Sequence, residues 1–113
     1  MYDRYDLFIN AGSDEIRVFK VVDACRNPVD TTGFKARMQI RPTKQSSVVL
    51  DELTTENKRL VFTDKGLKLH LTNEQTDAYD FCSGVYDIEV VNKEGLVSRL
   101  VEGRVYIRHG VTR

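Results

Sequence analysis

Residues 84–113 have the sequence GVYDIEVVNKEGLVSRLVEGRVYIRHGVTR, in which two strand patterns flank a turn. β-Branched and aromatic residues alternate with charged ones over residues 84–91, which predicts the first strand. The segment that follows, residues 92–95 (NKEG), is typical of a tight turn, because Asn and Gly tolerate the positive φ that such turns require. We expect a second, longer strand from Leu96 to Ile107. The sequence therefore predicts a long β-hairpin.

The second strand of this hairpin contains a change in the spacing of its apolar side chains. They fall on even positions first, at Leu96 and Leu100, and on odd positions later, at Val105 and Ile107. Because side chains alternate strictly between the two faces of a strand, the change requires one inserted residue. We expect this bulge at Gly103, where it would bend the strand. A hairpin with one long bent arm is typical of a small β-sandwich.

Shorter strand patterns precede the hairpin. They cover residues 5–9, 15–22, 34–41, 48–53, 60–62 and 67–71. The alternation is strictest over 34–41, and both faces of 15–22 are partly apolar, as expected for a strand that is covered on both sides. These patterns predict one core that contains Phe34, Ala36, Met38, Ile40, Leu67, Leu69, Leu71, Tyr86, Ile88 and Val105.

Residues 73–81 interrupt the strand patterns. Either Thr72 or Asn73 can cap the start of a helix, and Glu74 would lie in its first turn. We expect one or two helical turns here, closing one end of the sandwich and ending at Ser83-Gly84.

Length and charge restrict the class of protein. The chain has 113 residues, which predicts a single domain over residues 1–113. Its 17 basic and 17 acidic side chains cancel, whereas a general nucleic-acid-binding protein has a basic excess, so we expect no nucleic-acid partner. No apolar run approaches the roughly 18 residues of a membrane span. Asp3, Arg4 and Asp6 stand where a signal peptide needs apolar residues, so we expect a soluble protein that is made in the cytoplasm.

The charge is uneven along the chain although its sum is zero. Residues 1–30 carry 4 basic and 6 acidic side chains, 31–68 carry 8 and 4, 69–95 carry 1 and 6, and 96–113 carry 4 and 1. Two interpretations remain open. Strands of opposite sign can pair across a sheet, or a surface of two signs can fit copies or neighbours in a fixed orientation.

The residue types that carry chemistry form no recognisable site. Cys25 and Cys82 are far apart and have no metal-ligand or redox spacing, so we expect free thiols in a reducing cytosol. His70 and His109 lie on different predicted elements, and no glycine flanks Ser46-Ser47 as in a hydrolase elbow. We therefore expect no enzymatic activity, metal, cofactor or small-molecule substrate.

Five segments, taken in order, resemble a family of small tailed-bacteriophage proteins. They are PVDTTGF (residues 28–34), MQIR (38–41), GVYDIE (84–89), RLVEGRV (99–105) and VTR (111–113). In this order they are similar to the N-terminal β-sandwich domain of baseplate upper proteins and to stand-alone phage tail and virion proteins. The resemblance implies a structural role in a phage particle and brings no catalytic residues with it.

The patterns and the resemblance together predict an all-β fold. We expect an Ig-like antiparallel β-sandwich of about seven or eight strands with one short helix. The expected function is that of a structural component of a bacteriophage tail, as a baseplate, collar or fibre-attachment adaptor. It would be located in the virion and contact other phage structural proteins in a symmetric, multi-copy assembly. The alternatives are a capsid surface decoration protein and a receptor- or glycan-binding module.

One candidate partner-binding surface is a cationic stripe on residues 34–41. Lys35, Arg37 and Arg41 point to the same face of this predicted strand, together with Gln39. The alternative is a solvated face, or an edge that is protected against aggregation by its charges.

The second candidate is the segment after the last strand. Arg108, His109 and Arg113 could reach outward to an acidic neighbour. The alternative is a frayed terminus.

Overall fold

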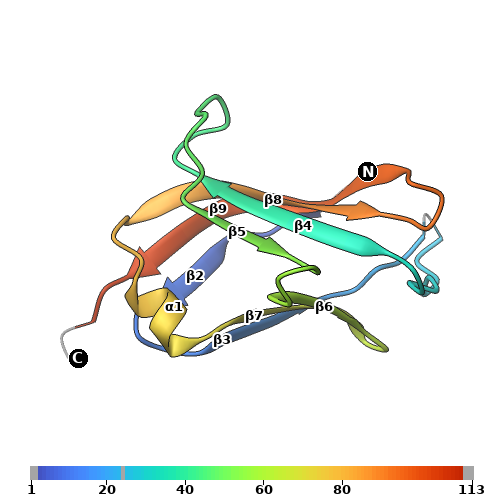
Figure 1. The fold of residues 1–113 in the computed structure, drawn as a ribbon, viewed down its shortest axis with the longest axis horizontal. Coiled ribbons are helices and arrows are strands. Elements are labelled where there is room, and N and C mark those ends of the chain that lie inside the picture. The colour runs from blue at the N-terminus through green and yellow to red at the C-terminus, as the bar shows by residue number, and fades with distance from the viewer. Residues whose placement is uncertain (1–2, 24, 111–113) are drawn as a thin grey trace.

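The computed structural model describes residues 3–23 and 25–110, which form a sandwich of two β-sheets (Figure 1). The large sheet contains β1 (Asp3–Arg4), β2 (Leu7–Asn10), β4 (Lys35–Arg41), β5 (Asp51–Thr54), β8 (Ser83–Val91) and β9 (Val97–Arg108). Its order is β1-β9-β8-β4-β5, and β2 also pairs with β9. The small sheet contains β3 (Glu15–Phe19), β7 (Gly66–Leu71) and β6 (Leu60–Thr63), in that order. The prediction of an all-β sandwich is confirmed.

The hairpin of β8 and β9 is formed as the sequence predicts. Each strand begins and ends within one residue of its expected bounds. In the turn, Asn92 Oδ1 accepts hydrogen bonds from the backbone N–H groups of Glu94 (3.0 Å) and Leu96 (2.9 Å), and Gly95 has a φ of +87°. The Asn and the Gly therefore have the turn roles that their conformational preferences indicate.

The inserted residue in β9 is present but lies at another position than expected. Ile88 pairs with Val101 and Glu89 pairs with Arg99, so Leu100 is the extra residue. The prediction of one bulge is confirmed, and its assignment to Gly103 is wrong. Gly103 pairs regularly with Tyr86.

Gly103 is required for a close approach of the N-terminal segment. A Cβ atom at this position would lie 2.1 Å from the carbonyl oxygen of Tyr5. The Tyr86 hydroxyl donates a hydrogen bond to the same carbonyl. Beside it, Asp6 Oδ1 accepts from the backbone N–H of Arg104 (2.9 Å). β1 and β2 pair with β9 one after the other, and these contacts hold the two residues between them, Tyr5 and Asp6, against β9.

This edge is parallel, whereas the sequence predicts only antiparallel strands. Leu7 pairs with Val105 and Ile9 with Ile107 in the parallel sense, and β1 pairs with β9 in the same way. The pairings among the other named strands of the described residues are antiparallel. Side-chain alternation predicts that a segment is a strand but does not fix the direction of its neighbour.

Two predicted strands are shifted or shortened. β3 ends at Phe19, and its side chains Ile16 and Val18 are 51% and 49% exposed. The expectation that this strand is covered on both faces is wrong, because no layer of the described residues lies outside the small sheet. Val48 and Val49, predicted to lie in a strand, are exposed before β5 begins.

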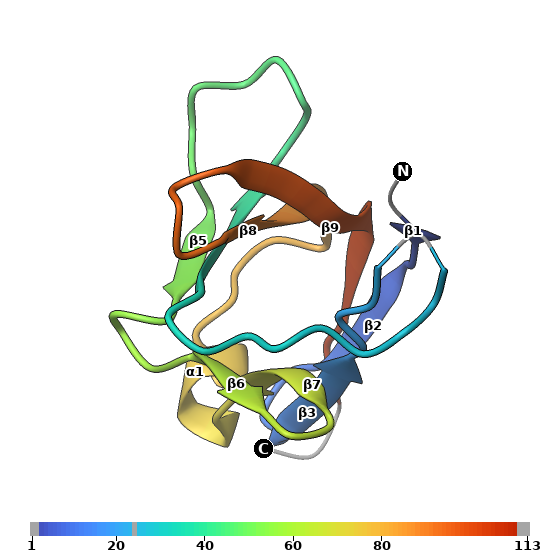
Figure 2. The ribbon, with the colours of Figure 1, turned by 90° about the vertical axis from the view of Figure 1, so that its right-hand side faces the viewer.

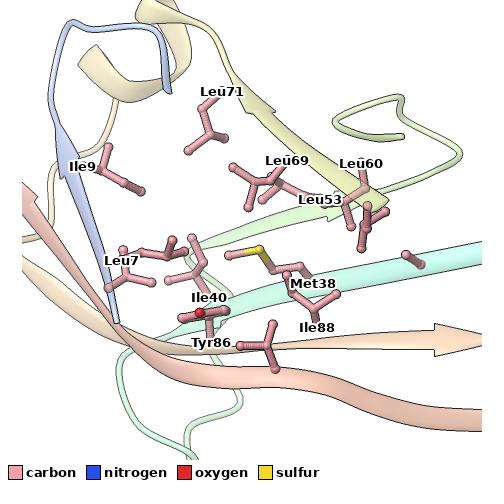
Figure 3. Close-up of a cluster of buried hydrophobic side chains, with 14 of the residues drawn as sticks. Leu7, Ile9, Met38, Ile40, Leu53, Leu60, Leu69, Leu71, Tyr86 and Ile88 are labelled. Carbon is pink, nitrogen blue, oxygen red and sulfur yellow. The ribbon is translucent and has the colours of Figure 1, made fainter. Parts of the chain in front are cut away.

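The core lies between the two sheets (Figure 3). Nine of the ten side chains predicted to form it are buried, and Phe34 is half-buried, with its ring edge-on to Phe62 at a centroid distance of 6.1 Å. The core also takes up Leu7, Ile9, Leu53 and Leu60. The strict alternation of β4 and β7 is therefore a reliable guide to the core.

The predicted helix is α1 (Asn73–Asp77), at one end of the sandwich (Figure 1). Thr72 caps it: its hydroxyl accepts from Gln75 N (3.2 Å), and Gln75 Oε1 accepts from Thr72 N (2.9 Å). The Thr76 hydroxyl donates to Ser13 O (2.8 Å) and accepts from Gly12 N (3.0 Å), which ties α1 to the β2–β3 turn. The helix ends before Ser83-Gly84, which belongs to β8.

Candidate interaction surface

The outward-facing side chains of β4, β8 and β9 form a charged surface on the large sheet. Because Ala36, Met38 and Ile40 point into the core, the alternate residues of β4 point outward. We call this surface the outer charged face. It consists of Arg37, Gln39, Arg41, Lys44, Asp87, Glu89, Arg99 and Glu102.

Cationic and acidic side chains alternate across this face. Arg37 pairs with Glu89 in the β4–β8 register, and Arg37 Nε lies 2.9 Å from Glu89 Oε1. From β9, Arg99 contacts Asp87 (3.4 Å) and Glu102 (3.4 Å). The interpretation that strands of opposite sign pair across the sheet is thus confirmed for β4 and β8.

The segment between β4 and β5 is attached to this face. Arg41 donates to Gln39 Oε1 from Nε (3.2 Å) and Nη2 (2.7 Å), and from Nη1 to the carbonyl oxygen of Ser46 (2.5 Å). Lys44 Nζ lies 3.6 Å from Glu102 Oε2. The segment stands out from the sandwich in Figure 1, and these contacts connect its residues Lys44 and Ser46 to β9 and β4.

Asp87 is a half-buried carboxylate of this face and is paired with Arg99. Burial raises the pKa of Asp87, and the neighbouring carboxylates of Glu89 and Glu102 add to the increase, while Arg99 and Arg41 oppose it. A shallow groove of about 310 Å³ lies over these residues. A further cation in this groove would stabilise the ionised form of Asp87. The face is therefore suited to receive a basic side chain from another molecule.

The structure places the predicted site residues in two separate regions. Lys35 is exposed at the start of β4, near the β8–β9 turn, and Arg37 and Arg41 continue the stripe along this strand. Arg108 is exposed at the opposite end of β9. His109 Nε2 lies 3.2 Å from the carbonyl oxygen of Phe81.

Arg113 lies outside the described residues. In the described part of the chain, the start of the stripe at Lys35 and the exposed Arg108 lie at opposite ends of the sheet.

Sequence reasoning missed the acidic half of the face. Asp87, Glu89 and Glu102 alternate with apolar residues in the predicted hairpin, so their outward direction could have been inferred. Their position beside the basic stripe depends on the pairing of β4 with β8, which is not apparent from either segment alone.

A second charged cluster lies near the core and joins the two sheets. Arg59, just before β6, donates to Asp51 Oδ1 (2.8 Å) and Oδ2 (2.5 Å), and the Tyr79 hydroxyl donates to Oδ2 (2.5 Å). Burial tends to raise the pKa of Asp51, but the hydrogen bonds from Arg59 and Tyr79 outweigh it and hold that pKa below its ordinary value. The cluster connects β5, β6 and the segment after α1, which indicates a structural role.

The described residues show no catalytic or metal-binding arrangement. No group of three or more His, Cys, Asp or Glu side chains among them could hold a metal ion. The Ser46 hydroxyl accepts a hydrogen bond from Val48 N (3.0 Å). Within residues 3–23 and 25–110, no helix has the length and apolar character needed to cross a membrane.

Comparisons with known proteins identify the fold. No protein-family model and no curated protein sequence matches the chain. A chain in the crystal structure of ICOS in complex with ICOS-L and an anti-ICOS-L VNAR domain is similar over 96% of this chain and 56% of its own length, with 11% identity and a TM-score of 0.51. The protein thus spans little more than half of that chain.

The extracellular domain of the voltage-gated sodium channel beta4 subunit is also similar. That structure contains parallel homodimers, which were related to the role of the subunit in cell–cell adhesion. The similarity covers 98% of this chain and 96% of the other, with 12% identity and a TM-score of 0.50. Both comparisons support an Ig-like sandwich.

Proposed function

We propose that the chain is a protein-interaction module that acts through its outer charged face. The observation that carries this proposal is the environment of Asp87, a carboxylate with a raised pKa beneath a groove between paired charges. A partner with a basic side chain over Asp87 and acidic side chains near Arg37 would fit in one orientation. Complementary charges of this kind determine the orientation of an interface more than its strength.

The proposed setting is a bacteriophage tail, where the chain would act as a baseplate, collar or fibre-attachment adaptor. This part of the proposal is supported by the resemblance of five ordered segments to baseplate upper proteins. The partners would be other structural proteins of the particle, arranged with symmetry. The solved structures that resemble the chain support its fold and are independent of this setting.

A capsid surface decoration protein would use the same kind of surface on the head of the particle. A receptor- or glycan-binding module is the third candidate, and one observation favours it. Phe8 is 56% exposed, and its ring stacks on Tyr106 with a centroid distance of 5.1 Å. Exposed aromatic rings are suited to cover the apolar face of a sugar.

Lysine cross-linking followed by mass spectrometry tests the proposed surface in purified particles encoded by the same genome. Lys44 lies on the outer charged face and Lys35 beside it, whereas Lys58 lies in the β5–β6 turn and serves as an internal control. We expect cross-links to other subunits from Lys35 and Lys44 and none from Lys58. Cross-links from Lys58 alone would contradict the assignment of the face. Absence of the chain from the particles would contradict the phage setting.

A further inference from the structure

A second surface lies on the open side of the sandwich, and its lining residues differ from those of the outer charged face. β1 ends the order of the large sheet and β3 ends that of the small sheet. A cleft of about 640 Å³ separates these two edges, about twice the volume of the groove over Asp87. In Figure 2, β1 and β3 lie on the same side of the molecule, and the segment that follows β3 passes close to β1. We call this feature the basic cleft.

Of the residues that the structure describes, four cationic side chains and no acidic one line the basic cleft. These are Arg4, Arg17, Lys20 and Arg26. Arg4 is 61% exposed and lies 3.6 Å from Asp6, and Arg17 is bound to Glu15 (3.2 Å) and to the carbonyl oxygen of Phe8 (2.9 Å). Among the described residues, Lys20 and Arg26 have no ion-pair partner. The cleft therefore has an excess of positive charge in a chain whose net charge is zero.

Hydrogen bonds link described residues on both sides of Arg26. Val22 and Pro28 form an antiparallel bridge, and Asp23 Oδ1 accepts from the backbone N–H groups of Cys25 and Asn27, each at 2.9 Å. The Asp23 carboxylate thus binds its own turn. Arg26 has a φ of +64°, a conformation that residues other than Gly adopt only when their surroundings require it. The backbone N–H of Arg26 also donates to the carbonyl oxygen of Asp23 (2.9 Å), and Arg26 lines the cleft.

Exposed apolar side chains also line the cleft. Val18 is 49% exposed, Val22 40% and Tyr5 45%. Phe19 packs edge-on against Tyr5 at a centroid distance of 5.8 Å, and buried Val101 forms part of the floor. A ligand that fills the cleft must therefore combine negative charge with apolar groups.

We propose that the basic cleft binds an acidic segment of a partner protein. Its carboxylates pair with Lys20 and Arg26, and its aliphatic side chains cover Val18 and Val22. The free edges of β1 and β3 also present backbone groups, which an extended segment can bind by adding to a sheet edge. The proposal does not depend on the outer charged face, because the two surfaces share no lining residue.

Fluorescence anisotropy with synthetic peptides tests this proposal on the full chain. The probe is a labelled peptide of about eight residues in which Glu alternates with Leu, long enough to follow one strand edge. One control peptide has Gln in place of every Glu, and the other has Ser in place of every Leu. We expect both controls to bind about tenfold more weakly than the probe, because each removes one class of contact. Equal binding of either control, or no binding of the probe at about 1 mM, would overturn the proposal.

Matched variants locate the binding. The double substitution Lys20→Gln, Arg26→Gln is expected to lower the affinity for the probe roughly threefold to tenfold, since each exposed charge contributes modestly. The control double variant, Lys58→Gln with Lys93→Gln, removes the same charge from two exposed turns and is expected to leave binding unchanged. An equal loss in both variants would show non-specific attraction and overturn the assignment.

Two more substitutions test the apolar contact in the cleft and the independence of the cleft from the outer charged face. Val18→Thr keeps a β-branched residue in β3 and removes apolar surface, so we expect weaker binding of the probe and an unchanged melting temperature. Asp87→Arg on the outer charged face is expected to leave probe binding unaltered. Failure of this proposal is thereby distinguished from failure of the proposed function.

Sedimentation of the unmodified chain tests a second copy as the occupant. We expect a monomer. Concentration-dependent self-association that disappears in the Lys20→Gln, Arg26→Gln variant would assign the cleft to another copy of the chain and overturn the assignment to a separate partner.

Discussion

Asp51 links the two sheets through its bonds to Arg59 and Tyr79, and its protonation should therefore affect stability. Its pKa is lowered in the folded chain, so ionised Asp51 stabilises the fold above the ordinary pKa of the unfolded chain, about 3.9. This contribution is lost as the pH falls through the lower, folded value. We predict that Asp51→Asn lowers the free energy of unfolding at pH 7 by about 3 kcal/mol, because Arg59 loses its partner.

Urea unfolding between pH 7 and acid checks this prediction. The difference between the two proteins should become smaller below about pH 4. Asp64→Asn, in an exposed turn, is the control and should behave as the unmodified chain does. A constant difference at all pH values would show that the ionised form of Asp51 contributes nothing.

Gly103 gives a second prediction for a single residue. Gly103→Ala places a methyl group against the Tyr5 carbonyl, so the segment between β1 and β2 must move. We expect a loss of about 3 kcal/mol in unfolding free energy, similar to overpacking in a core. Hydrogen exchange should show weaker protection of the Tyr5 and Arg104 amides in the variant. Unchanged stability would mean that the N-terminal segment is not closely packed on β9.

Among the elements, β4 follows its sequence pattern closely, and this can be tested by two neighbouring substitutions. Met38 is 1% exposed between the sheets, whereas Arg37 points outward. Met38→Ala should lower the free energy of unfolding by about 2–5 kcal/mol, and Arg37→Ala by less than about 1 kcal/mol. Thermal or urea unfolding measures both. Similar losses in the two variants would contradict the inward and outward assignment of β4.

Elements that depend on distant partners were predicted less well. The bounds of β4, β8 and β9 and the cap of α1 follow from local residues, and the structure confirms them. The parallel edge does not follow from local residues, because no residue of β2 encodes the direction of β9. The predicted position of the bulge is wrong because a glycine in a strand is typical of a bulge, whereas Gly103 is required for the close approach of Tyr5.

At the scale of the whole molecule, the sandwich forms without two common features of Ig domains. The chain has no tryptophan, and Cys25 and Cys82 are free and exposed, so no disulfide joins the sheets. Aliphatic side chains from both sheets form the core instead. The fold was predictable because the strand patterns and turns are sufficient without these features.

The sequence predicts the basic stripe of the outer charged face but not the basic cleft. The basic stripe of Lys35, Arg37 and Arg41 follows from alternation within one strand. The basic cleft is formed by residues from the start of the chain, β3, the next turn and β9, which come together only in the folded molecule.

The C-terminal segment gives a prediction for the assembled state. Deleting residues 109–113 should leave the melting temperature nearly unchanged, since His109 and Gly110 are exposed and lie beyond β9. If Arg113 and its neighbours bind another subunit, as we predict, the shortened chain will not enter particles. Quantitative mass spectrometry of purified particles measures this. Normal incorporation would favour a frayed terminus.

Two matched charge-reversal variants test whether the outer charged face binds the partner. Asp87→Arg changes the carboxylate beneath the groove, and Asp64→Arg makes the same change in the β6–β7 turn. We predict that Asp87→Arg retains at least about tenfold less partner in purified assemblies, with a similar melting temperature, because like charges then oppose one another. Asp64→Arg should retain the partner fully. Equal retention of the partner by the two variants would show that the outer charged face does not bind it.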